Sequence, residues 1–201
     1  MLVNERPAVY AVLETRIDTE HLAKPCTVRE FFYAMGYSLV CWNSSKKNYS
    51  NHGVLVAVRA DLADEVQIHA GLGVPTSDEE GRVLTIEFDD HAAVIAYAPC
   101  TQWGTPRPCA KRAVFQEGLR CHLVEWNERK PTMLLGDLNV APTEADRTYY
   151  PPVPDDATTC DHHPHSGVRT MDRKTMSSCK DSERRWHADL LADTNMVDAI
   201  C

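Results

Sequence analysis

MLLGDLNVAP, residues 133–142, is the part of this sequence that says most about fold and chemistry. Its short apolar run predicts a buried strand, and the glycine that follows predicts a turn. Asp137 and Asn139 alternate with Leu138, so in an extended backbone their side chains would leave the same face. A carboxylate beside a carboxamide can hold a water molecule and stabilise an anionic oxygen, as hydrolysis requires. An Asp/Asn-rich loop without a catalytic role is the alternative.

A second apolar run also ends in an acidic residue. It is VYAVLETR, residues 9–16, and the acid is Glu14. Open sheets tend to bind ligands beyond the ends of their strands, where side chains from several strands meet. Two acid-tipped strands far apart in sequence therefore fit one metal site with oxygen ligands, the kind that Mg²⁺ prefers. A solvated acid at a strand end is the alternative for Glu14.

The hydrophobic pattern alternates between strands and helices. Phe115, Leu119, Leu123 and Trp126 recur at helical spacing and predict an amphipathic helix with one core-facing stripe. Residues 82–88 alternate in a way that suits a strand packed on one face. The expected strands are 9–13, 38–42, 53–58, 82–88, 93–97 and 133–135, and the expected helices are 28–35, 110–128 and one that begins at Asp181 or Ser182. This order predicts an α/β layered domain.

Composition limits the class of protein. With 201 residues, 43% of them hydrophobic, the chain can bury the core of one sizeable domain. Its eight cysteines lack CxxC spacing, which favours reduced thiols inside a cell. A net charge of −8 argues against binding nucleic acid through bulk electrostatics. We find no apolar run of membrane-spanning length and no signal peptide, and so expect an intracellular protein: nuclear first, with the cytoplasm and mitochondrion as alternatives.

The sequence resembles the exonuclease III-type apurinic/apyrimidinic endonucleases of the endonuclease/exonuclease/phosphatase superfamily. Seven segments match in the family's order and cover nearly the whole chain, which makes the resemblance specific. They are LETR (13–16), NYSNHGVLVAVR (48–59), EGRVLTIEF (80–88), VIAYAP (94–99), KRAVFQEGLRCHLVEW (111–126), RKPTMLLGDLNVAPTEAD (129–146) and SERRWHADLLADTNMVDAI (182–200).

The resemblance implies a fold, an activity and a set of site residues. The fold would be a four-layer α/β sandwich, incomplete in this chain, and the activity would be Mg²⁺-dependent (or Mn²⁺-dependent) hydrolysis of DNA at abasic sites in base excision repair. Exonuclease action at 3′ ends is a further option. Glu14 matches the metal-binding glutamate, Asp137 the aspartate that orients or deprotonates water, Asn139 the asparagine that binds the reacting phosphate, and Tyr97 a tyrosine that contacts it.

Weaker matches concern the DNA backbone. Tyr49 and Arg82 occupy positions that touch DNA in relatives, although a loop aromatic and a turn cation are the alternatives. Arg107, Lys111 and Arg112 supply local positive charge, for phosphate contacts or as a solvated helix start.

Other features depart from the family. The WNVNG-like motif upstream of the LETR strand and the SDH-like motif near the family's C-terminus are not found, and Cys100 and Trp103 replace an asparagine and an arginine. We therefore expect one partial domain over residues 1–201, completed by a protein partner or by further chain segments. Two alternatives stay open: a degenerate relative that serves as a binding or assembly module, and a hydrolase of RNA or of small phosphoesters.

Residues 149–180 or so are rich in Pro, Asp, His and Ser and predict a long polar surface loop. Cys160, His162, His163 and His165 lie within it. Their spacing is too close for the usual structural zinc site, and a polar loop accounts for them.

Overall fold

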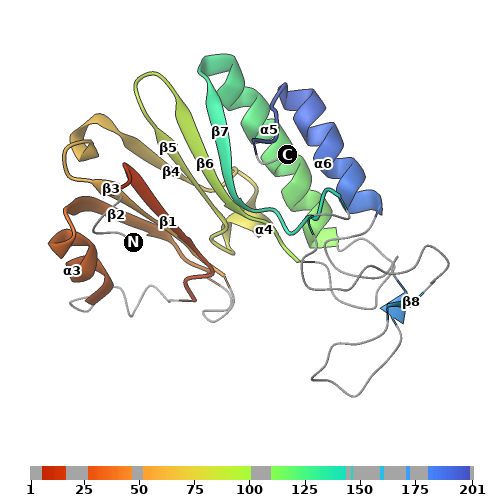
Figure 1. Cartoon of the computed structure of the whole chain (residues 1–201), viewed down its shortest axis with the longest axis horizontal. Helices are drawn as coiled ribbons and strands as arrows, with labels where there is room; N and C mark the ends of the chain where they lie inside the picture. The colour runs from red at the N-terminus through yellow and green to blue at the C-terminus, as the bar shows by residue number, and fades with distance from the viewer. Residues whose placement is uncertain are drawn as a thin grey trace. The chain divides into compact units, whose positions relative to one another are not determined.

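The computed structural model, drawn in Figure 1, divides into two compact units. The first comprises residues 1–98 and 117–138, and the second comprises residues 99–116 and 139–201. The residues that the structure describes are 6–16, 27–46, 52–100, 110–143, 146, 159–160, 171–172 and 181–199.

The first unit contains a three-stranded antiparallel sheet, here called sheet A. Its strands are β1 (Val9–Leu13), β2 (Tyr37–Asn43) and β3 (Val54–Arg59), in the order β1-β3-β2. The central strand β3 carries the sequence VLVAV, all buried, as β-branched and apolar residues on a doubly covered strand should be. These three strands confirm the sequence prediction to within a residue or two.

A four-stranded mixed sheet, sheet B, forms the other half of the first unit. Its strands are β4 (Gln67–Ala70), β5 (Val83–Glu87), β6 (Ala92–Tyr97) and β7 (Thr132–Asp137), in that spatial order. Strands β6 and β7 are parallel, and helix α5 (Ala110–Arg129) lies between them in the sequence. The short helices η1 (Ala63–Glu65) and α4 (Pro75–Asp78) flank β4. None of these three elements was predicted from the sequence.

The two sheets pack face to face around one apolar core. Val54 and Val56 of β3 meet Leu84 and Ile86 of β5 and Ile95 of β6 in this core. Because both outer faces of the sandwich are also apolar, each needs a helix to cover it.

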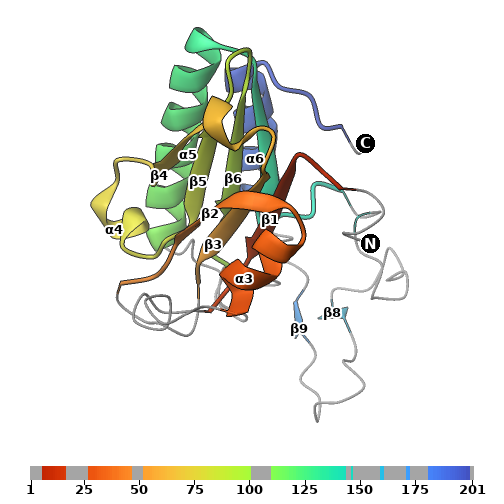
Figure 2. The ribbon, with the colours of Figure 1, turned by 90° about the vertical axis from the view of Figure 1, so that its left-hand side faces the viewer.

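Helices cover both outer faces. Helix α3 (Thr27–Ala34) covers sheet A, as Figure 2 shows, and its Phe32 packs against Leu55 and Ala57 of β3. Helix α5 covers sheet B, where His122 Nε2 lies 2.8 Å from the Thr85 hydroxyl and Trp126 packs beside His69. The arrangement confirms the predicted α/β sandwich of helix, sheet, sheet and helix.

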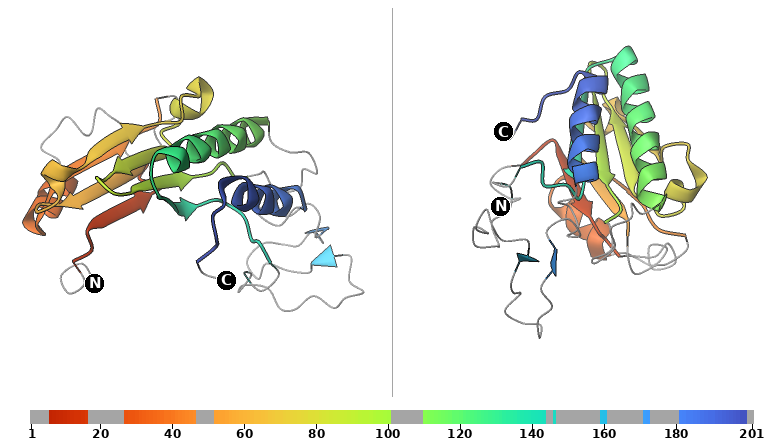
Figure 3. Two further views of the ribbon diagram at one scale, coloured as in Figure 1. Left: turned by 90° about the horizontal axis from the view of Figure 1, so that it is seen from above. Right: turned by 90° about the vertical axis from the view of Figure 1, so that its right-hand side faces the viewer.

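Burial corrects two details of the prediction. Strand β5 is buried on both faces from Val83 to Ile86, because the core lies on one side and α5 on the other. Strand β7 is not a buried strand: it is the edge of sheet B, and its Met133 and Leu135 are 48% and 50% exposed. Strand β1 is an edge strand of sheet A, and Figure 3 shows β1 and β7 at the same side of the sandwich.

The second unit contains helix α6 (Asp181–Thr194), which begins where the sequence predicted, with Leu190 buried. Strands β8 (Thr159–Cys160) and β9 (Met171–Asp172) form a small antiparallel pair within the expected polar loop. The rest of that loop, including the His-rich segment, lies outside the described residues. None of the helices in the described part of the chain is long and apolar enough to cross a membrane.

Candidate active site

Glu14 is the first residue after β1, in the turn that follows this strand. Its backbone φ is +52°, an unusual conformation for a residue with a side chain, and Arg16 has the same φ. Two backbone bonds hold the turn: the Thr15 amide donates to the Gly53 carbonyl at 3.2 Å, and the Arg16 amide donates to the His52 carbonyl at 3.1 Å. The carboxylate is therefore fixed at the start of β3 by tertiary contacts rather than by local preference.

Tyr97, the last residue of β6, donates its hydroxyl to Glu14 Oε1 at 2.6 Å. The other oxygen, Oε2, accepts from Arg16 at 2.9 Å. The hydrogen bond from Tyr97, and then Arg16, lower the pKa of the Glu14 carboxyl below its usual range. Burial, and then the bond to Glu14, raise the pKa of the Tyr97 hydroxyl to about 12. At neutral pH, Glu14 is thus an anion and Tyr97 a hydrogen-bond donor.

A buried guanidinium supports the tyrosine. Arg82 Nη1 donates to the Tyr97 carbonyl at 3.1 Å, and the guanidinium carbon lies 5.0 Å from the centre of the Tyr97 ring. Arg82 Nε donates to Glu80 at 2.6 Å, and Nη2 lies 3.0 Å from Nδ1 of His52. Tyr97 is thereby held through both its backbone and its ring.

Asp137, the last residue of β7, pairs with Tyr97 in the parallel register. The charge of Asp137 also raises the pKa of Tyr97, after burial and Glu14. Gly136 makes the close approach of β7 to β6 possible: its φ is +137°, and a Cβ there would collide with the Ala96 carbonyl oxygen. The structure thus brings together three predicted site residues: Glu14, Tyr97 and Asp137.

Asn139 differs from the prediction. Strand β7 ends at Asp137, and Asn139 has a φ of +51°, so the two residues do not continue one extended strand. The inference that their side chains leave a common face by simple alternation is therefore wrong. Asn139 belongs to the second unit, and its proposed role in binding phosphate stays a prediction.

The structure gives different settings to the predicted DNA-contacting residues. Lys111 is exposed in the first turn of α5, where a phosphate could reach it. Arg82 is buried, and its guanidinium is engaged with Glu80, His52 and Tyr97, so its contact with DNA stays a prediction. Tyr49 and Arg107 lie outside the described residues.

The sequence analysis missed two residues of this site, His52 and Glu80. Glu80 and Arg82 flank Gly81 in the turn before β5, where Gly81 has a φ of +65°, and the turn brings their opposite charges together. The available signal in the EGR tripeptide is a glycine between two opposite charges, which is typical of a turn. His52 meets Arg82 only because β3 folds against β5, and no local pattern indicates it.

The predicted magnesium ion would have Glu14 as its protein ligand, and this metal site stays a prediction. Glu14 is ionised and its side chain is 39% exposed, so its free lone pairs can be reached from solvent. Mg²⁺ commonly binds through one or two carboxylates and completes its shell with water and phosphate oxygens. Within the described ranges, no group of three or more His, Cys, Asp or Glu residues is arranged to hold a metal.

Comparison with known proteins finds nucleases that are similar to this chain, although no family model matches it. It is 36% identical over 108 residues to an exodeoxyribonuclease of Bacillus subtilis, covering 53% of this chain and 40% of the relative. It is 29% identical over 143 residues to a DNA-(apurinic or apyrimidinic site) endonuclease of Dictyostelium discoideum, covering 71% and 37%. The chain thus spans about two fifths of the length of these relatives.

A solved structure with a similar fold is also an AP endonuclease. The crystal structure of an AP endonuclease from Leishmania major superposes with a TM-score of 0.72 at 19% sequence identity, covering 96% of this chain and 59% of the other. At 19% identity this superposition supports the fold alone, and the sequence similarity rests on the two curated relatives. The chain is therefore similar in sequence to exodeoxyribonucleases and apurinic/apyrimidinic endonucleases, and it has the fold of an AP endonuclease, as its ordered motifs indicated.

Proposed function

We propose that this chain carries the catalytic face of a Mg²⁺-dependent nuclease that hydrolyses the DNA backbone at abasic sites. The observation that carries the proposal is the hydrogen bond from Tyr97 to Glu14, formed beside Asp137 at the ends of three strands. A fixed anionic carboxylate can bind a metal, a neutral phenol can donate to a phosphate oxygen, and a second carboxylate can accept a proton from water; these are functions that phosphodiester hydrolysis uses. The names of the curated relatives, an exodeoxyribonuclease and an apurinic-site endonuclease, support the substrate class.

Each residue has a distinct role in this proposal. Asp137, exposed at the end of β7, accepts a proton from the attacking water. Tyr97 stays protonated at neutral pH because its pKa is about 12, so it acts as a donor and not as a base. Asn139 donates its amide to the phosphate. Arg82 and Glu80 keep Tyr97 in place from behind.

Glu14 would hold the metal through its solvent-facing lone pairs. When bound, Mg²⁺ supplies positive charge that offsets the charge of the phosphate in the transition state. The Arg16 guanidinium that now pairs with Oε2 of Glu14 would have to share or yield this oxygen. Mn²⁺ has similar ligand preferences and is expected to substitute.

The experiment is cleavage of an abasic duplex with Mg²⁺ by the purified chain, beside undamaged duplex, RNA and a small phosphoester. Asp137→Ala and Glu14→Gln should each lower the cleavage rate by about 10²–10⁴-fold. Asp61→Asn is the matched control, because Asp61 is an exposed carboxylate paired with Arg59 at 2.6 Å at the far end of β3. It should cleave at the wild-type rate. Equal rates for wild type and Asp137→Ala would refute the proposal.

A second candidate function is that of a binding module in a larger assembly. Among the described strands, β7 is an edge strand of sheet B, and its exposed Met133 and Leu135 favour this candidate, since exposed apolar edge strands invite pairing with another chain. Size-exclusion chromatography with light scattering tests this candidate. A stable monomer that captures no partner in pull-downs would remove its basis.

A further inference from the structure

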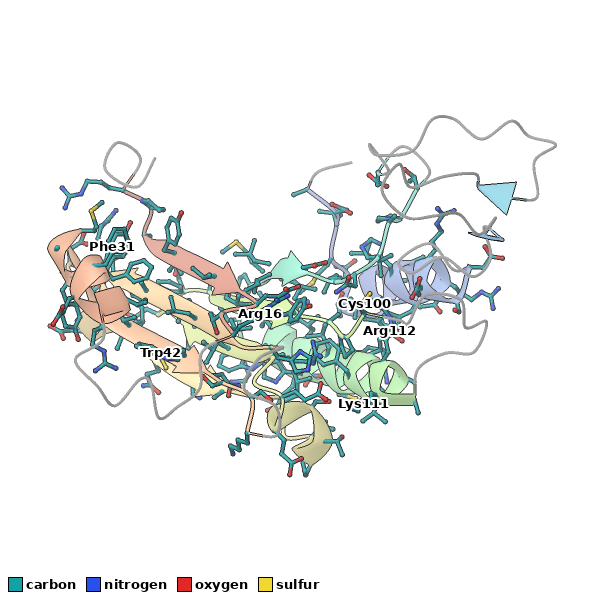
Figure 4. All side chains as sticks on the ribbon, turned by 90° about the horizontal axis from the view of Figure 1, so that it is seen from below. Arg16, Phe31, Trp42, Cys100, Lys111 and Arg112 are labelled. Carbon is teal, nitrogen blue, oxygen red and sulfur yellow. The ribbon has the colours of Figure 1, made fainter. Side chains whose placement is uncertain are left out.

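Arg112 is a buried cation in the first turn of α5. Its exposed fraction is 2%, whereas its neighbour Lys111 is exposed, and Figure 4 labels both residues together with Cys100. The sequence predicted that Arg112 would contact phosphate or belong to a solvated helix start. Neither expectation fits a side chain that solvent does not reach. A buried guanidinium is costly to desolvate unless it is paired and hydrogen-bonded, so its partners indicate its purpose.

Arg112 has two backbone carbonyls and one carboxylate among its partners. Nη1 donates to the Pro99 carbonyl at 2.6 Å, and Nη2 donates to the Asn139 carbonyl at 3.1 Å. Nε lies 3.8 Å from a carboxylate oxygen of Glu183 in α6, which is itself 3% exposed. The planar fork of an arginine can bridge two acceptors at once, which a lysine ammonium does less well.

The two carbonyls belong to the segments that follow the candidate site residues. Pro99 comes two residues after Tyr97, and Asn139 comes two residues after Asp137. Asn139 also has a left-handed backbone, with a φ of +51°, which costs free energy unless the surroundings hold it. The bond from Arg112 to its carbonyl is one of the contacts that hold it.

We propose that Arg112 is a positioning residue: it clamps the chain after β6 to the chain after β7, and so sets the direction of the Asn139 amide. This inference rests on the proposed nuclease function and adds to it a residue that touches neither DNA nor metal. Because a displacement of about 1 Å in a catalytic group can cost about 10²-fold in rate, loss of the clamp should act on kcat.

Arg112→Met and Arg112→Lys test the clamp through steady-state kinetics on an abasic duplex. Arg112→Met should lower kcat by about 10²-fold, while the KM for DNA stays within about threefold. Arg112→Lys retains the charge beside Glu183 and one donor, and should recover about tenfold of the loss. A raised KM with unchanged kcat would overturn the proposal in favour of direct phosphate binding, and an unchanged kcat and KM in both variants would overturn it outright.

Leu190→Ala is the matched control for general destabilisation, since Leu190 is buried in α6 of the same unit and bonds to neither segment through its side chain. At temperatures well below unfolding it should keep the wild-type kcat. If Leu190→Ala loses as much kcat as Arg112→Met, the effect is structural and the positioning role is refuted.

Amide hydrogen exchange provides a measurement that does not need activity. Exchange in peptides covering residues 138–143 should rise at least about tenfold in Arg112→Met and remain near the wild-type rate in Leu190→Ala. Unchanged exchange would overturn the clamp even if the wild type cleaves DNA. Raised exchange in a chain that cleaves no substrate would support the clamp and count only against the proposed function.

Discussion

Replacing Tyr97 by phenylalanine removes a single hydroxyl, the donor to Glu14 Oε1 at 2.6 Å, and leaves the buried ring in place. A hydrogen bond to a charged group contributes about 1.5–3 kcal/mol to stability. Because the Glu14 side chain is 39% exposed, solvent screening reduces that contribution. We therefore expect Tyr97→Phe to lower the free energy of unfolding at neutral pH by about 1 kcal/mol.

This loss should depend on pH because the acceptor titrates. The folded-state pKa of Glu14 lies below its ordinary value of 4.5, so its contribution to stability is fully present above that value. The contribution disappears as the pH falls through the lowered pKa, where the carboxyl takes up a proton. The difference in stability between wild type and Tyr97→Phe should therefore shrink in acid.

Tyr37→Phe is the matched control. The Tyr37 hydroxyl is also buried, but it donates to the neutral carbonyl of Pro7 at 2.9 Å, so its removal should cost about 1 kcal/mol without a pH dependence. Urea denaturation followed by circular dichroism, from about pH 7 to about pH 3.5, measures both differences. If the cost of Tyr97→Phe is as constant as that of Tyr37→Phe, the coupling between Tyr97 and Glu14 does not exist.

Three further predictions concern the scaffold. Gly136→Ala should lower stability by about 1–3 kcal/mol in thermal denaturation, because its Cβ meets the neighbouring strand; Gly73→Ala, where a Cβ meets nothing within 4 Å, should cost clearly less. Leu135→Lys should shift the chain toward monomer in light scattering, and unchanged association would show that the β7 edge is not the contact. Burial lowers the pKa of His122, so the folded protein favours the neutral imidazole. The free energy of unfolding should therefore fall as the pH drops below about 6.5, the ordinary pKa of histidine. His122→Gln, which can still bond Thr85, should reduce this fall, as measured by urea midpoints.

Local patterns predicted most of the framework. The apolar run of β1, the alternation in β5 and the helical stripe of α5 each involve residues close in sequence, and all three elements formed within a residue or two of the predicted bounds. Strand β4 was missed because it has four residues, two of which, Gln67 and His69, are polar. Its place is fixed by pairing with β5 and by contacts to α5, which are not local.

Burial and partner choice could not be predicted in the same way. The apolar residues of β7 indicate a buried strand, yet the exposure of Met133 and Leu135 depends on which distant element covers their face of the sheet. The same limit applies to Arg82 and Arg112, whose sequences suggest surface cations. Each is buried because distant segments supply acceptors for its guanidinium: Glu80 and the Tyr97 carbonyl for Arg82, and two loop carbonyls for Arg112.

Backbone strain connects these non-local contacts to the chemistry. Glu14 and Asn139, two of the predicted site residues, both have positive φ, a conformation that costs a residue with a side chain roughly 1–2 kcal/mol. Asparagine tolerates it, but glutamate gains nothing from it locally, so the cost at Glu14 has to be offset by its tertiary contacts. Those contacts are the bond from Tyr97, the pair with Arg16 and the backbone bonds of the turn to β3. A strained residue held this way keeps one orientation of its carboxylate, which is what a group that must bind a metal or a phosphate at a fixed point requires.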